Sequence, residues 1–243
     1  MKTVIIGDIH GCCQELVALL AKVQFDRGQD RLVSLGDLMD RGRESYEVFD
    51  LFRYLKTEMG EECVIIRGNH EQMMLDASIN PFARILWKQN GGGKTIRSFY
   101  RHQDHVYRHA GWFRKNTVPY YEDVRFQCTH AGVQDGDIAQ SDKETLLWDR
   151  KRLTDNDYSG KLTIVGHTPL SGPAWCAGDK KTRAVLTERV RMSLPEQGMI
   201  CLDTGCVFGY RLTAMVVEED RTYWLESVPR VDSAPADDVP GPG

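Results

Sequence analysis

The sequence has no apolar run that approaches the ~20 residues needed to cross a membrane. Residues 1–6 already read as the start of a strand, which leaves no room for a secretory signal peptide. We therefore expect a cytoplasmic protein with no membrane partner.

Positive charge is not in excess either. The chain has 31 Lys and Arg against 35 Asp and Glu, a formal net charge of −4, so no global basic field attracts nucleic acid. We expect no nucleic-acid partner. At 41% hydrophobic and 27% charged, the composition is ordinary for a globular protein, and 243 residues suffice for one α/β domain.

The seven cysteines form neither a C-x-x-C zinc motif nor an even-numbered disulfide framework. We interpret them as free thiols in a reducing cytoplasm.

One short segment stands out among what the sequence does contain. The apolar residues 32–35 predict a buried strand, and Gly36-Asp37-Leu38-Met39-Asp40-Arg41-Gly42 follows at its end. Burying such charges costs several kcal/mol unless they are paired or bind a metal. Taken alone, the segment fits a salt bridge in a strand-to-helix turn equally well.

The same arrangement occurs on both sides of this segment. Residues 3–6 predict a strand that leads into Asp8-Ile9-His10, and residues 63–66 predict one that leads into Gly68-Asn69-His70-Glu71. Helical patterns at 14–23 and 46–55 lie between them. The order β-α-β-α-β predicts a parallel sheet with these polar side chains at one edge.

Residues 72–114 predict a helical insertion, interrupted by Asn90-Gly91-Gly92-Gly93, which we expect to be a mobile loop. A plain helix–helix connection and a substrate contact are both open alternatives for this glycine run. We expect His102, His105 and His109 in the insertion to form a solvated face.

Strands are predicted again near 124–128 and 162–165, and they lead into His130 and His167. Later strand-like runs, with few helical patterns, predict a second, mostly antiparallel sheet facing the first; they lie at 174–177, 199–203, 211–217 and 222–226. We expect one domain over residues 1–228 and a disordered tail over 229–243.

Five separate strand-end turns thus carry oxygen or imidazole donors and no thiolate. The set suits ions such as Mn²⁺, Fe²⁺ or Zn²⁺ rather than a structural zinc site. The candidate ligands are Asp8, His10, Asp37, Asn69, His130 and His167.

These motifs together resemble the five-part signature of the phosphoprotein phosphatases, a branch of the calcineurin-like metallophosphoesterases. The bacterial and bacteriophage lambda type of serine/threonine protein phosphatase is the most similar. The resemblance spans residues 3–217. It implies an α/β fold, a four-layer α-β-β-α sandwich of two mixed sheets with a helical insertion. Further segments that resemble this type are Asn69-His70-Glu71-Gln72-Met73-Met74, Asn90-Gly91-Gly92-Gly93, Trp148-Asp149-Arg150 and Leu202-Asp203-Thr204-Gly205.

The resemblance also implies two divalent metal ions as cofactors. Asp8, His10 and Asp37 would bind one, and Asp37, Asn69, His130 and His167 the other, with Asp37 as the bridge. Mn²⁺ is the expected ion, and Zn²⁺, Fe²⁺ and Ni²⁺ are alternatives. Two such ions lie ~3.5–4 Å apart and acidify a bridging water molecule, the implied nucleophile.

The implied catalytic residues are His70, Asp40, Arg41 and Arg150. Paired with Asp40, His70 would stay protonated and donate to the leaving alkoxide. Arg41 and Arg150 would bind the phosphoryl oxygens. Arg152 is an alternative to Arg150.

The implied activity is that of a metal-dependent serine/threonine protein phosphatase, with tyrosine phosphate as a further candidate substrate. A phosphoprotein or phosphopeptide would bind, and inorganic phosphate would leave. The main alternative is a symmetrical dinucleoside tetraphosphate hydrolase, or another nucleotide or small-molecule phosphohydrolase. That hydrolase subfamily typically has alanine where this chain has Asp40. A non-catalytic metal-binding scaffold would need a missing ligand or acid, and none is missing.

Overall fold

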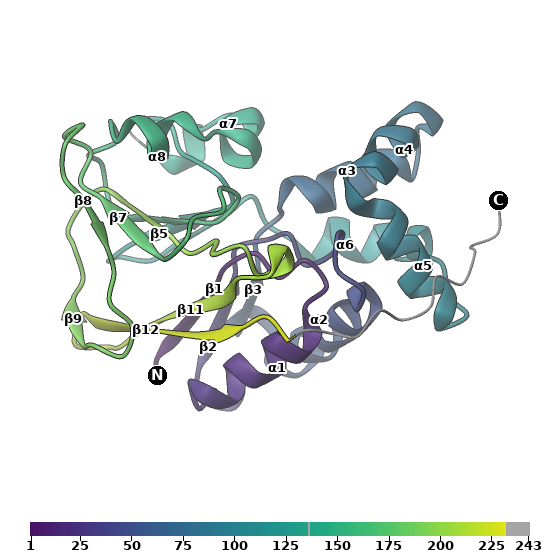
Figure 1. Cartoon of the computed structure of the whole chain (residues 1–243), viewed down its shortest axis with the longest axis horizontal. Helices are drawn as coiled ribbons and strands as arrows, with labels where there is room; N and C mark the ends of the chain where they lie inside the picture. Colours follow the sequence, from purple (N-terminus) through teal and green to yellow (C-terminus); the bar gives the residue numbers. More distant parts are fainter. Residues whose placement is uncertain (136, 232–243) are drawn as a thin grey trace.

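Two six-stranded mixed β-sheets form the centre of the structure, a computed structural model that describes residues 1–135 and 137–231. They pack face to face, with helices on both outer faces, so the layers run helix, sheet, sheet, helix (Figure 1). The predicted four-layer sandwich of two mixed sheets is confirmed.

The first sheet has three parallel strands at one side, and its other strands are antiparallel. Its spatial order is β3 (Cys63–Ile65), β2 (Arg31–Ser34), β1 (Thr3–Ile6), β11 (Arg211–Val217), β12 (Thr222–Pro229) and β9 (Met192–Ser193).

The second sheet has a parallel core of β5, β6 and β10, with antiparallel strands at both sides. Its order is β4 (Tyr120–Glu122), β5 (Gln127–Thr129), β6 (Thr163–Val165), β10 (Met199–Cys201), β7 (Ala174–Cys176) and β8 (Arg183–Val185).

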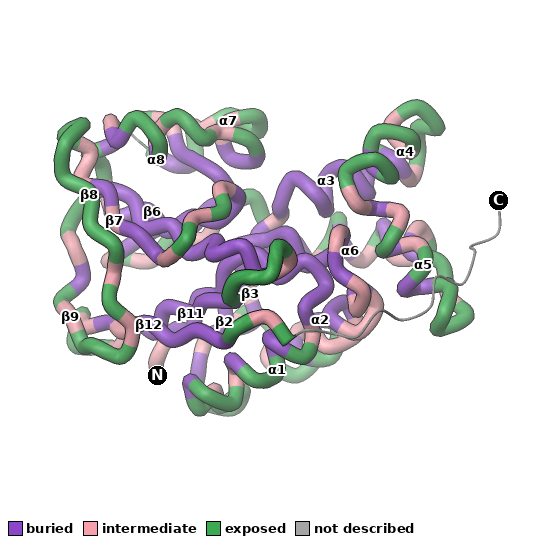
Figure 2. The backbone as a smooth tube through the Cα atoms, in the orientation of Figure 1, coloured by how far each residue is buried: buried purple, intermediate pink, exposed green. Residues whose placement is uncertain are grey.

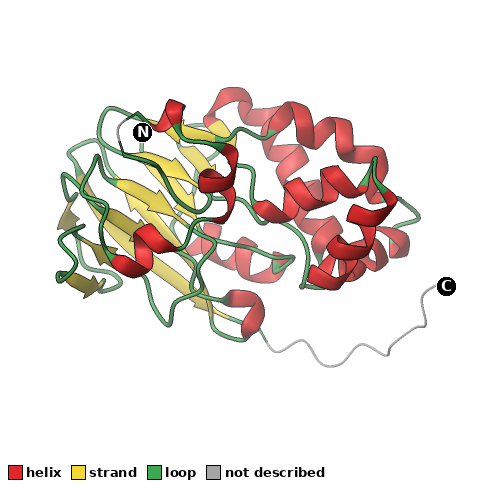
Figure 3. Cartoon of the chain, turned by 90° about the horizontal axis from the view of Figure 1, so that it is seen from above, coloured by secondary structure: helices red, strands yellow, loops and turns green. Residues whose placement is uncertain are grey.

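The helices gather on the outer faces and at one end of the strands (Figure 3). The α-helices are α1 (Cys13–Lys22), α2 (Ser45–Met59), α3 (Asn69–Ala77), α4 (Pro81–Trp87), α5 (Gly93–Arg101), α6 (Ala110–Asn116), α7 (Lys143–Trp148) and α8 (Lys151–Asp155). Shorter helical turns are η1 (Gly60–Glu62), η2 (Lys88–Gly92), η3 (Val106–His109), η4 (Ile138–Gln140) and η5 (Cys206–Phe208).

Alternation along β1 explains the layering. Val4 and Ile6 join the core under α1 and α2, whereas Ile5 points into the core between the two sheets. The central strands are accordingly buried on both faces (Figure 2). A third core, which includes Leu146 and Leu153, lies between the second sheet and α7 and α8.

The glycine run Asn90–Gly93 spans a kink between α4 and α5: η2 ends at Gly92, α5 begins at Gly93, and Gly91 has a non-helical φ of 114°. A Cβ on Gly92 would lie 2.4 Å from the Trp87 ring, so glycine is needed for the indole to pack against the turn. The run therefore connects two helices.

Two strand predictions also need correction. Residues 124–126 are not strand, because Arg125 donates from its backbone N–H and its Nε to Asp123 in a turn that links β4 to β5. The runs at 211–217 and 222–226 do not join the second sheet. They are β11 and β12, and β11 pairs with β1 in the first sheet. Because β11 is buried on both faces after Arg211, its apolar pattern could not indicate which sheet it joins.

The C-terminal segment continues past β12 onto α1. Arg230 donates to Glu15 at 2.9 Å, and so does the backbone N–H of Val231 at 2.8 Å. The rest of the predicted tail, 232–243, lies outside the described residues. Among the described residues, no helix combines the length and apolar character required to cross a bilayer. All seven cysteines are free thiols.

Candidate metal centre

The ends of five strands place all six predicted metal ligands in one buried region. β1 leads to Asp8 and His10, β2 to Asp37, β3 to Asn69, and β5 and β6 to His130 and His167. Each of these side chains is at most 5% exposed. Carboxyl ends of parallel strands are the usual location of sites in α/β sheets.

The turns that carry these side chains have unusual backbone geometry. His10, Asp37, Asp40, Arg41 and His167 all have a positive φ, between 46° and 72°. Non-glycine residues in this region cost about 1–3 kcal/mol each and cluster at functional sites. The strain allows several side chains from tight turns to face one point.

Asp37 lies at the centre of the group. Its Oδ2 is 3.3 Å from His10 Nε2 and 3.9 Å from His70 Nε2, and its Oδ1 is 3.5 Å from His130 Nε2. Two sets of potential ligand atoms therefore share Asp37: one with His10 and His70, the other with His130 and His167. Burial favours a neutral Asp37, but His130, His70 and His10 outweigh it and hold its pKa below the usual range.

Glu71 fixes the turn that carries Asp37. Its carboxylate accepts from the backbone N–H groups of Asp37 at 2.8 Å, Leu38 at 2.9 Å and Gly68 at 3.0 Å. Burial, then Asp37, raise the pKa of Glu71 to about 7. A Cβ on Gly68 would lie 2.1 Å from Asp37 Oδ1, so only glycine allows this approach. Sequence reasoning gave Glu71 no role, although an acid at the third residue of a helix commonly accepts from the N-cap backbone N–H, as Glu71 does from Gly68.

Asp8 reaches the centre by a different contact. Both carboxylate oxygens accept from the His167 backbone N–H at 3.1 Å, and Asp8 belongs to neither set around Asp37. Burial, then Asp203 and Asp37, raise the pKa of Asp8 well above its usual value. Asp203 is a buried acid that sequence reasoning did not assign; burial raises its pKa to about 6.

The donor set fits divalent cations. His10 Nδ1 donates to Met39 O and His130 Nδ1 to Leu35 O, both at 2.8 Å, so each Nε2 keeps its lone pair facing inward. His130 Nε2 lies 2.9 Å from Asn69 Oδ1, which is also an acceptor.

The charge states of the histidines also favour a cation site. Buried His167 Nε2 has no hydrogen-bond partner within residues 1–135 and 137–231. Burial lowers the pKa of His10 and of His167 to about 3, so both imidazoles are neutral. Neutral imidazoles facing buried carboxylates form a site that a cation would satisfy.

His70 and Asp40 form a buried pair beside this group. His70 Nδ1 donates to Asp40 Oδ2 at 2.7 Å. Asp40 also accepts from Trp87 Nε1 at 2.7 Å and from Thr95 Oγ1 at 2.6 Å. Burial alone would lower the pKa of His70, but Asp37 and Asp40 raise it above the ordinary value. Trp87 and Thr95 come from the insertion, and no sequence signal linked them to Asp40.

The two predicted arginines lie on different sides of the centre. Arg41 Nη1 donates to His10 Nε2 at 2.7 Å. Exposed Arg150 donates to Thr168 Oγ1 at 3.3 Å, next to His167. Arg152, the alternative to Arg150, instead pairs with acids remote from the centre, Asp135 and Asp157.

The three histidines of the insertion lie away from this centre. His102 stacks on Tyr46 with ring centroids 4.1 Å apart, His109 lies 2.6 Å from Asp104, and His105 is exposed. They share no helix face, because α5 ends at Arg101.

Comparisons with known proteins agree with this geometry. The family model described as calcineurin-like phosphoesterase matches residues 1–194. The chain is 33% identical over 220 residues to serine/threonine-protein phosphatase 1 of Salmonella typhimurium, covering 86% of this chain and 88% of the relative. It is also 35% identical over 279 residues to the symmetrical bis(5′-nucleosyl)-tetraphosphatase of Photorhabdus laumondii, covering 93% and 97%.

A solved cold-active protein tyrosine phosphatase has the same fold. Its TM-score is 0.66 at 15% identity, and the match covers 94% of this chain and 78% of that one. From the buried donor set, the sandwich and the family match, the chain belongs to the calcineurin-like phosphoesterases, hydrolases of phosphate esters.

Proposed function

We propose that this chain is a metal-dependent phosphomonoesterase that removes phosphate from serine and threonine residues of proteins. The observation that carries the proposal is the buried His70–Asp40 pair, with His70 Nδ1 2.7 Å from Asp40 Oδ2 and His70 Nε2 turned toward Asp37. The general activity, hydrolysis of phosphate esters, follows from membership of the family.

Six side chains would hold two divalent cations, with Mn²⁺ as the expected ion and Asp37 contributing to both sites. When bound, the cations would acidify a water molecule for attack and offset the charge of the phosphoryl group. The proposed ligands are Asp8, His10, Asp37, Asn69, His130 and His167.

Arg41 and Arg150 would bind the phosphoryl oxygens from two directions. Arg41 lies on the His10 side and Arg150 on the His167 side. A planar guanidinium forms two parallel bonds to a phosphate, which both neutralises and orients it. Arg41 is additionally held over the Phe208 ring at 5.5 Å.

His70 would supply the proton to the leaving oxygen. The carboxylate of Asp40 accepts from His70 Nδ1, which fixes the ring and keeps Nε2–H available for donation. A serine or threonine alkoxide is a poor leaving group and needs this proton. The raised pKa of His70 keeps the acid form populated near neutral pH.

A symmetrical dinucleoside tetraphosphate hydrolase is the second candidate, favoured by relatives of that name at similar identity. Its leaving group is a phosphate, which departs without a strong acid, so a buried His–Asp pair serves it less.

The His70→Asn variant tests the proposal. General acid catalysis is worth roughly 10²–10⁴ in rate, but only where the leaving group needs a proton. The single-turnover rate should fall by about that factor on a phosphoserine peptide, and far less on p-nitrophenyl phosphate, because p-nitrophenolate leaves unaided.

Metal content of the variant should match the wild type, since His70 is not a proposed ligand. Asp40→Asn should also slow hydrolysis of the phosphoserine peptide more than that of p-nitrophenyl phosphate. Both rates should fall less than in the His70 variant. Equal losses on both substrates would mean that His70 serves binding or metal geometry, and the proposal would lose its mechanistic support.

A further inference from the structure

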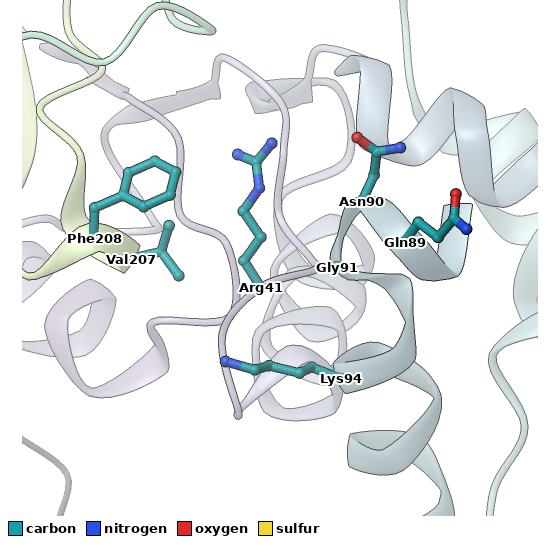
Figure 4. A pocket seen from close by; sticks show the side chains of 7 residues that line it. All are labelled: Arg41, Gln89, Asn90, Gly91, Lys94, Val207 and Phe208. Atoms are coloured by element: carbon teal, nitrogen blue, oxygen red, sulfur yellow. The ribbon is translucent and has the colours of Figure 1, made fainter. Parts of the chain in front are cut away.

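A cleft of about 420 Å³ opens beside Arg41, outside the predicted metal ligands. Figure 4 shows the walls: Asn90 and Gly91 of the helical turn η2 on one side, and Val207 and Phe208 of η5 on the other. Arg41 projects between these walls, and Lys94 of α5 extends along the base toward the η5 side.

The charge of this cleft has one sign. Within residues 1–135 and 137–231, Arg41 and Lys94 are the only charged residues that line it. Lys94 is exposed and has no ion pair or hydrogen bond with its side chain among the described residues. Two cations at one opening with no facing carboxylate attract an anionic group.

The cleft is continuous with the proposed phosphoryl site. The same Arg41 side chain that lines it donates to His10 Nε2 at 2.7 Å. The Arg41 backbone N–H also donates to Gly91 O at 3.3 Å. A Cβ on Gly91 would lie 2.8 Å from Arg41 Cγ, so the glycine, at φ 114°, allows η2 to approach this residue. Arg41 therefore links the cleft directly to the proposed phosphoryl site.

The η5 wall is apolar and accessible. Phe208 is 54% exposed, and Arg41 lies over its ring at 5.5 Å. The cleft thus offers an apolar surface at Phe208 and a positive charge at Lys94. An acidic side chain of a peptide substrate would supply methylene groups for the first and a carboxylate for the second.

We propose that this cleft is a specificity subsite for an acidic residue that flanks the phosphorylated residue of a protein substrate, and that Lys94 determines this preference. This inference rests on the proposed phosphatase function. It specifies which substrate residues, next to the phosphorylated one, the same site would favour. Lys94 acts on the flanking residue and takes no part in phosphoryl transfer.

Charge reversal at Lys94 tests the inference. The probes are three phosphoserine peptides that differ only in the flanking residues, which are Asp, Ala or Lys, with p-nitrophenyl phosphate as a substrate that has no flank. We expect wild-type kcat/KM to be about fivefold higher for the Asp peptide than for the Lys peptide at low salt, as for a screened ion pair. Lys94→Glu should reverse this order, and the rate of each protein on p-nitrophenyl phosphate serves as the reference for any general change at the metal centre.

Lys88→Glu is the matched control. Lys88 is an exposed lysine of the adjoining turn η2 that does not line the cleft, and its reversal makes the same change in net charge. The Lys88→Glu variant should hydrolyse the three peptides in the same order of kcat/KM as the wild type. Loss of the preference at 0.5 M salt would further support an electrostatic origin.

The outcomes separate the two proposals. Peptides that are hydrolysed with the same flank order by wild type and Lys94→Glu would overturn the inference and leave the phosphatase function standing. Hydrolysis of p-nitrophenyl phosphate without any phosphopeptide would overturn the function, and the inference with it. A dinucleoside tetraphosphate preferred by wild type, and lost in Lys94→Glu, would assign the cleft to a nucleotide instead.

Discussion

At the scale of single residues, the proposed pair of metal sites depends on Asp37. Its two carboxylate oxygens face different histidines, His10 on one side and His130 on the other, and Glu71 holds its turn through the backbone. Replacing the carboxylate with a neutral amide would remove one of these oxygens and also the negative charge that both proposed metal sites share.

Asp37→Asn should therefore lose both metals and nearly all activity together. The measurement is elemental analysis after gel filtration, beside the rate on p-nitrophenyl phosphate. Asp50→Asn, which changes a half-exposed carboxylate of α2, is the control and should keep both metals. Two tightly bound metals per Asp37→Asn chain, with activity intact, would refute the bridging role.

Arg150 is the second test at this scale. Arg150→Ala should raise KM for a phosphopeptide about tenfold and weaken inhibition by free phosphate, because one charged hydrogen-bond donor to the phosphoryl group is lost. Metal content should not change. Arg152→Ala is the control, since that side chain pairs with Asp135 and Asp157. If only the Arg152 variant loses phosphate affinity, the role belongs to Arg152.

At the scale of elements, β12 is joined to α1 and to the segment before β9 through one nearly buried acid. Glu226 Oε1 lies 3.3 Å from Lys22 Nζ of α1 and 3.0 Å from Arg189 Nη2. Burial favours the neutral acid, but the hydrogen bonds from Arg189 and Lys22 outweigh it and lower the pKa of Glu226. The folded state therefore favours the ionised form more than the unfolded state does.

Glu226→Gln should consequently reduce the free energy of unfolding at pH 7 by about 1 kcal/mol. A lowered pKa contributes stability above the unfolded value, near 4.3, and this contribution is lost as pH falls through the folded value. Urea unfolding of wild type and variant should thus converge below about pH 4. The exposed Glu196→Gln is the control. A difference that is constant from pH 7 to pH 3 would contradict the ion-pair origin.

Contacts between elements also explain which features could be predicted from the sequence and which could not. Asp8, Asp37 and His70 stand in short motifs directly after recognisable strands, so local patterns located them. Trp87 and Thr95 bind Asp40 across 47 and 55 residues of chain, and no local pattern encodes such a contact. The strand β11 was recognised but placed in the wrong sheet, because a run buried on both faces fits either sheet.

At the scale of the whole molecule, the sandwich brings together turns from both sheets. β1, β2 and β3 of the first sheet supply Asp8, Asp37 and Asn69, and β5 and β6 of the second supply His130 and His167. The helical insertion then adds the donors to Asp40 and one wall of the Arg41 cleft. The proposed substrate selection therefore depends on both sheets and the insertion, and a test of it must use a chain that contains all of them.

The most direct test compares two substrates on the manganese-loaded chain of residues 1–243. The substrates are a phosphoserine peptide and a symmetrical dinucleoside tetraphosphate, and kcat/KM is measured for both at pH 7. Because the buried acid pair accelerates departure of an alkoxide and does little for a phosphate leaving group, we predict that the peptide is hydrolysed more efficiently than the tetraphosphate. A dinucleoside tetraphosphate that is hydrolysed faster than the peptide would contradict the account.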